Sequence, residues 1–108
     1  MFSEELKIIA REGYKEALDA DSKKDGLAMI DSLIRKMWAK SIGHINTRFE
    51  SIGGNISDNQ IISTYRQMNN IWKNVYDELE KEKIYFFSRN SFGILCKVQV
   101  PAISKYLN

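Results

Sequence analysis

The sequence contains one cysteine, one proline and one histidine among its 108 residues. A single cysteine cannot form an internal disulfide, so the composition gives no sign of an oxidising compartment. No apolar stretch approaches the roughly 20 residues that a membrane-spanning helix needs. The first residues, MFSEELK, carry acids where a signal peptide carries bases and then an apolar run. These absences predict a cytoplasmic protein that does not bind membranes.

Residue patterns that support catalysis or metal binding are equally scarce. His44 and Cys96 stand alone, and no CxxC, HExxH or paired-histidine spacing is present, which argues against a structural zinc site. The segment DADSKKDG invites comparison with a calcium loop that starts at Asp21. However, it has Lys23 where an oxygen ligand belongs and Ser32 where a glutamate belongs. We therefore expect a non-enzymatic protein with no metal and no cofactor.

The overall composition predicts one globular domain that covers residues 1–108, because 44% of the residues are hydrophobic and 28% are charged. The net charge is only +2, but it is distributed unevenly. Residues 81–108 contain five bases and one acid, and residues 31–57 contain four bases and two acids. Such asymmetry can mark a surface for an anionic partner.

The first half of the chain spaces its apolar residues as amphipathic helices do. One helix is predicted from its N-cap, Ser3, to the turn DADSKKDG. Ser22 or Asp25 caps the next helix, which covers about residues 23–51 and includes Trp38 in its apolar seam.

The third predicted helix has the clearest signature. Ser57 and Gln60 fit a capping box at its start, and the helix extends to about residue 83. We expect its apolar seam, like Trp38, to be buried in the core, although the heptad-like spacing would also suit a homodimer. The seam consists of Ile61, Tyr65, Met68, Trp72, Val75 and Leu79.

The stretch KIYFFSRNSFGILCKVQV, residues 83–100, changes character because it is rich in β-branched and aromatic residues. It favours a hairpin with strands at 84–87 and 94–99. Helical spacing through Phe92, Leu95, Val98 and Ala102 is the alternative. The predicted fold is therefore mainly α, a small bundle of about three long helices with a C-terminal β-hairpin, and an all-α fold is the alternative.

Four basic side chains recur at intervals of four in the second predicted helix: Lys36, Lys40, His44 and Arg48. Each step of four residues advances about 40° around a helix, so the four form one slanting stripe. Such a stripe suits an acidic protein surface or a row of phosphates. A solvated face that keeps the domain soluble is the alternative interpretation.

Two functional interpretations follow. The first is a small binding protein of the inhibitor or adaptor type, of the size that phages and mobile elements often encode, which engages another protein through Lys36, Lys40, His44 and Arg48. The second is a winged-helix DNA-binding protein built from residues 57–100. In it the third helix breaks at 68–70, residues 71–82 form the recognition helix and residues 84–100 form the wing. Its nucleic-acid contacts would be Lys73, Lys83, Arg89 and Lys97.

Overall fold

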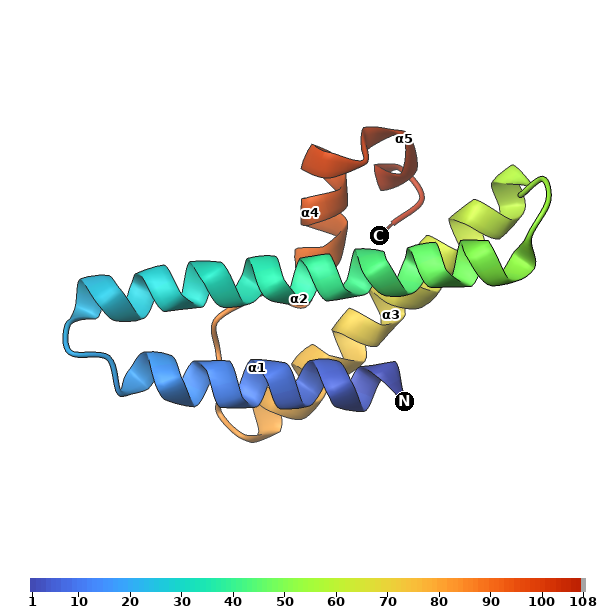
Figure 1. The fold of residues 1–108 in the computed structure, drawn as a ribbon. Coiled ribbons are helices and arrows are strands. Elements are labelled where there is room, and N and C mark those ends of the chain that lie inside the picture. Colours follow the sequence, from blue (N-terminus) through green and yellow to red (C-terminus); the bar gives the residue numbers. More distant parts are fainter. Residues whose placement is uncertain (108) are drawn as a thin grey trace.

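The computed structural model describes residues 1–107 and consists of helices joined by short connections. The helices are α1 (Phe2–Leu18), α2 (Lys23–Ile52), α3 (Asp58–Lys81), α4 (Ser91–Gln99) and α5 (Pro101–Ser104). Helices α1 and α2 run antiparallel side by side, and α3 crosses behind them (Figure 1). Helices α4 and α5 form a small C-terminal unit on the far side of α2 from α1 (Figure 1).

The helix starts follow local capping chemistry. Ser22 caps α2, since its hydroxyl accepts a hydrogen bond from the Asp25 N–H at 3.1 Å. Ser57 and Gln60 form the predicted capping box at the start of α3. Both predictions are thus confirmed. The prediction for α1 is wrong by two residues, because Met1 rather than Ser3 is the N-cap and no side chain caps the helix.

Helix α3 ends in a Schellman turn whose left-handed residue is a lysine. Lys83 has a φ of 60°. The Ile84 N–H donates to the Leu79 carbonyl at 3.0 Å, and the Lys83 N–H donates to the Glu80 carbonyl at 2.9 Å. Leu79 and Ile84 are both buried, so the turn redirects the chain and returns Ile84 to the core.

The seam of α3 forms the centre of the core. Trp72 and Leu79 are fully buried, as predicted, whereas Trp38 is only partly buried. The indole N–H of Trp72 donates to Ser41 Oγ at 2.8 Å, and Ser41 Oγ donates to the Met37 carbonyl at 2.8 Å. This chain of bonds satisfies the buried polar groups where α3 crosses α2. The seam therefore packs within its own chain.

The predicted β-hairpin is wrong. Residues 84–90 are irregular, residues 91–99 are helical, and no strand occurs within residues 1–107. Phe92 and Cys96, one helical turn apart, are both fully buried. A two-stranded hairpin with no sheet beside it is at best marginally stable in water, so burial of this helical pair outweighs the β-propensity of the segment. The alternative all-α fold is the one observed.

The winged-helix arrangement is wrong as well, because its wing was the predicted hairpin. Helix α3 continues without a break through residues 68–70, and both Met68 and Asn69 are buried there. Residues 71–82 therefore do not form a separate recognition helix, and most of the segment predicted as the wing folds as α4. Arg89, predicted to contact nucleic acid from the wing, instead donates from Nε to Asp77 Oδ1 at 3.0 Å.

An ion pair fixes the start of the connection that follows α3. Arg11 of α1 donates two hydrogen bonds to the Glu82 carboxylate, at 2.7 and 2.8 Å. This bonding lowers the pKa of Glu82 below its ordinary value. Its contribution to stability is therefore present above the pKa of Glu82 in the unfolded chain and is lost as the pH falls through the folded pKa. The pair is solvent-accessible, so the contribution is small.

Candidate partner-binding face of α2

The four basic residues predicted to act together share one exposed face of α2. Lys36, Lys40, His44 and Arg48 all lie in the continuous part of this helix, and all four are exposed. Met37, Ser41 and Ile45, which lie about 100° around the helix from the basic row, are buried. We call the four residues the basic face. Its position away from the core leaves it free to contact another molecule.

The start of α1 lies alongside α2 (Figure 1), and two of its side chains contact the basic face. The Phe2 ring stacks on the His44 ring, with centroids 4.3 Å apart and planes 22° apart. Glu5 approaches the Lys40 ammonium at 4.0 Å, and both side chains remain about half exposed. Phe2 therefore adds an apolar surface to the basic face, and Glu5 adds one acid at its edge.

Lys36 and Arg48 are the residues of the basic face whose positive charge has no nearby carboxylate. Among residues 1–107, no carboxylate lies within ion-pairing distance of either side chain. By contrast, the neighbouring Arg35 is paired, since its Nε donates to Asp31 Oδ2 at 2.9 Å. The two unpaired cations therefore lie on the basic face and can meet an external anion at little desolvation cost.

Between α1 and α2 the basic face is hollowed into a shallow groove of about 520 Å³. Its floor is low because small residues, Ala39 and Gly43, stand beside the long basic side chains. The groove is lined by Phe2, Glu5, Lys36, Ala39, Lys40, Gly43, His44 and Thr47.

Gly43 has no structural reason to be glycine. It lies in the middle of α2, and a Cβ added there would meet no atom within 4 Å. We expect Gly43→Ala to raise the free energy of unfolding by about 0.5–1 kcal/mol, because alanine has the higher helix propensity. Urea unfolding would measure the change. Gly13→Ala is the matched control and should gain less stability, since its Cβ would lie 2.5 Å from Leu33 Cδ1 and this buried side chain would have to shift. A loss of stability in Gly43→Ala would contradict this account.

The residues predicted for nucleic-acid contact do not form one surface. Lys73 lies within α3, Lys83 forms the left-handed turn after it, and Arg89 is paired with Asp77. Lys97 lies on α4 beside α5, where it lines a different pocket. With the wing absent, these four side chains have no common element to present them to a duplex.

The single cysteine and the single histidine of the chain lie in different settings. Cys96 is fully buried on α4, and burial raises the pKa of its thiol to about 12, so the reactive thiolate is scarce at neutral pH. His44 is exposed and stacks on Phe2. Within residues 1–107, no three His, Cys, Asp or Glu side chains gather closely enough to hold a metal ion.

Sequence reasoning missed Phe2, Glu5 and the groove. Nothing in the spacing of α1 shows that its first turn lies beside His44, because that depends on how far α1 and α2 slide past each other. None of the four residues of the basic face is an acid, but Glu5 reaches Lys40 from α1. An acid at position 5 gives no sequence signal for this contact.

The chemistry of the basic face suits reversible binding of an anionic surface.

None of the helices in the described part of the chain combines the length and the apolar character that crossing a membrane requires. Comparisons with protein-family models, with curated proteins and with solved structures each give no match.

Proposed function

We propose that this protein is a non-enzymatic binding protein of the inhibitor or adaptor type, and that it holds an acidic surface of another protein against its basic face. The observation that carries the proposal is the exposed row of Lys36, Lys40, His44 and Arg48 beside a groove whose floor includes Gly43. A glycine that weakens an exposed helix without aiding packing is expected where another molecule approaches closely. Its single free cysteine suits the cytoplasm.

An acidic protein fits this face better than nucleic acid does. Glu5 lies at the edge of the groove and would repel a continuous row of phosphates. Phe2 presents an aromatic surface in the same groove, which suits a partner that combines carboxylates with apolar side chains. Interfaces between proteins commonly place aromatic residues and arginines among such mixed contacts. A net charge of +2 is also modest for a nucleic-acid-binding domain.

The test begins with an affinity pull-down from the source cell, with and without nuclease, followed by binding measurements on the purified partner. The triple variant Lys36→Glu, Lys40→Glu, Arg48→Glu should abolish binding, because it reverses the charge of the basic face. It should leave thermal unfolding nearly unchanged, because exposed charges contribute little to stability. A partner that survives nuclease and carries an acidic surface supports the proposal.

A charge-matched control separates the face from net charge. The triple variant Lys15→Glu, Lys24→Glu, Lys81→Glu makes the same change in net charge at exposed positions elsewhere and should bind as wild type does. Loss of binding on nuclease treatment would instead indicate nucleic acid. Three phosphate contacts would then give a slope of log affinity against log salt of about −2.7. If the Lys36, Lys40, Arg48 variant binds the partner as tightly as wild type, the basic face is only a solvated surface and the proposal is wrong.

A further inference from the structure

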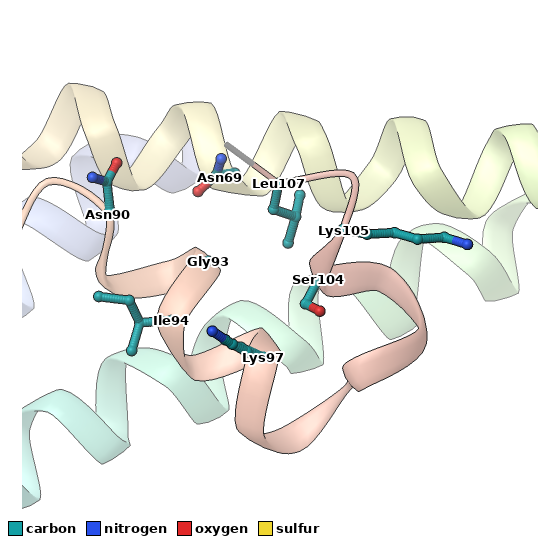
Figure 2. Close-up of a pocket in the computed structure, with 8 residues that line it drawn as sticks. All are labelled: Asn69, Asn90, Gly93, Ile94, Lys97, Ser104, Lys105 and Leu107. Atoms are coloured by element: carbon teal, nitrogen blue, oxygen red, sulfur yellow. The ribbon is translucent and has the colours of Figure 1, made fainter.

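A second concave site lies between α3 and the C-terminal unit, away from the basic face. It is an open pocket of about 440 Å³, a size typical of small-molecule sites. Side chains from α3, α4, α5 and the residues after α5 line it (Figure 2). Ile94 and Leu107 give it apolar walls, and Gly93 leaves a gap in the wall that α4 forms.

At the α3 side of this pocket is a buried amide with an unused acceptor. Asn69 is 4% exposed, and its Oδ1 accepts no hydrogen bond within the described residues. Figure 2 shows the oxygen on the side of Asn69 that faces α4. A Cβ at position 93 would lie 3.9 Å from it. A buried acceptor without a donor costs free energy, so an N–H or O–H from a ligand would relieve a cost that the fold bears.

The pocket is also positively charged. Lys97 and Lys105 line it, and none of its lining residues is acidic. Lys105 additionally lies over the Tyr106 ring, with its ammonium 5.1 Å from the ring centroid. The first turn of α4 borders the pocket and has neither a side-chain cap nor an acid. The positive end of the helix dipole is thus left uncompensated there. Lys97 and the helix end together favour an anion, whereas the Lys105 side chain extends away from Lys97 (Figure 2).

We infer that this pocket binds a small organic carboxylate that also carries a hydrogen-bond donor and an apolar group. The donor bonds Asn69 Oδ1, the carboxylate lies near Lys97, and the apolar group contacts Ile94 and Leu107. This pocket is separate from the basic face, so the inference about its ligand does not depend on the partner proposed above.

Three matched probes test the donor and the charge in turn. N-acetyl-leucine has one N–H, one carboxylate and one apolar side chain. N-acetyl-N-methyl-leucine lacks the N–H, and N-acetyl-leucine amide lacks the charge. We expect N-acetyl-leucine to bind with a dissociation constant on the order of 1 mM, as befits about a dozen heavy atoms. Each altered probe should bind about tenfold more weakly. NMR titration would follow the side-chain amide of Asn69 and the backbone amide of Gly93.

Two variants should lose the ligand without losing the fold. Asn69→Leu removes the acceptor and replaces it with an apolar group of similar size, which a buried site tolerates. Gly93→Ala places a methyl group in ordinary contact, 3.6 Å from the Leu107 carbonyl oxygen and 3.9 Å from Asn69 Oδ1. Alanine also favours the helix. Both variants should unfold at the wild-type temperature or above it, yet bind N-acetyl-leucine about tenfold more weakly.

Charge variants complete the test. Lys97→Gln should weaken binding several-fold, whereas Lys81→Gln, on the exposed end of α3, should leave it unchanged. The inference is overturned if no saturable shift occurs at Asn69 and Gly93. It is equally overturned if the three probes shift these amides alike, or if Asn69→Leu lowers the unfolding temperature and leaves binding intact. The last result would show that the amide serves the fold alone.

Discussion

Replacing Trp72 with alanine is expected to lower the free energy of unfolding by roughly 3–5 kcal/mol. Trp72 is fully buried and its ring contacts the rings of Phe87 and Phe92, with centroids 5.8 and 5.7 Å away. The truncation would leave a large cavity at the crossing of α2 and α3, where the surrounding helices cannot close it. Urea unfolding followed by circular dichroism would measure the loss. A cost under about 1 kcal/mol would mean that this side chain is not a core residue.

The hydrogen bond from Trp72 to Ser41 can be separated from the bulk of the ring. Ser41→Ala should cost about 1–3 kcal/mol, because it leaves the buried indole N–H without an acceptor. Trp72→Phe removes the donor and keeps an aromatic ring. Because the two groups are bonded at 2.8 Å, the double variant should cost less than the sum of the two single variants. Strict additivity would show that the two groups are not coupled.

The second large effect is expected at Phe92, where alanine should also cost roughly 3–5 kcal/mol. Phe92 is fully buried, and its ring lies 5.2 Å from Trp38 and 6.3 Å from Tyr65, centroid to centroid. Because an isolated nine-residue helix is not stable in water, loss of this anchor should also release α4. Hydrogen exchange would show it as lost amide protection over residues 91–99.

Val98→Ala is the matched control on the same helix. Val98 is 72% exposed, so its truncation should change stability by no more than about 0.5 kcal/mol. If Phe92→Ala and Val98→Ala had similar effects, α4 would not be held by its buried face. The replacement of the expected hairpin by a docked helix would then need another explanation.

The helices that could be predicted are those whose signals are local. Ser57 and Gln60 lie three residues apart and mark the start of α3 by themselves, and the seam from Tyr65 to Leu79 repeats with a helical period. The stretch from 84 to 100 could not be predicted in this way. Its fold depends on Phe92 finding a place between Trp38 and Trp72, residues that are distant in the sequence. Local β-propensity favours strands in this stretch because it takes no account of contacts with residues that are distant in the sequence.

The basic face and the pocket beside Asn69 differ in the same way: the first could be predicted from local sequence, and the second could not. The cations of the basic face recur within one helix, so their common exposure follows from helical geometry alone. Asn69 stands in the middle of MNN, next to another asparagine, and no local pattern separates the buried amide from its exposed neighbour Asn70. Its role beside Lys97 emerges only when α4 and the residues after α5 fold back against α3. Sites that several elements assemble are the ones that sequence spacing misses.

The position of Phe92 in the chain also matters while the protein is being made. Trp38 and Trp72 leave the ribosome first, and Phe92 follows Trp72 by 20 residues. At about 5–20 residues per second, this interval lasts roughly 1–4 s, whereas helices form within microseconds. Most of α2 and α3 therefore precedes the covering ring in leaving the ribosome. During each round of translation, the apolar surface that Phe92 later covers is exposed to water and to other nascent chains.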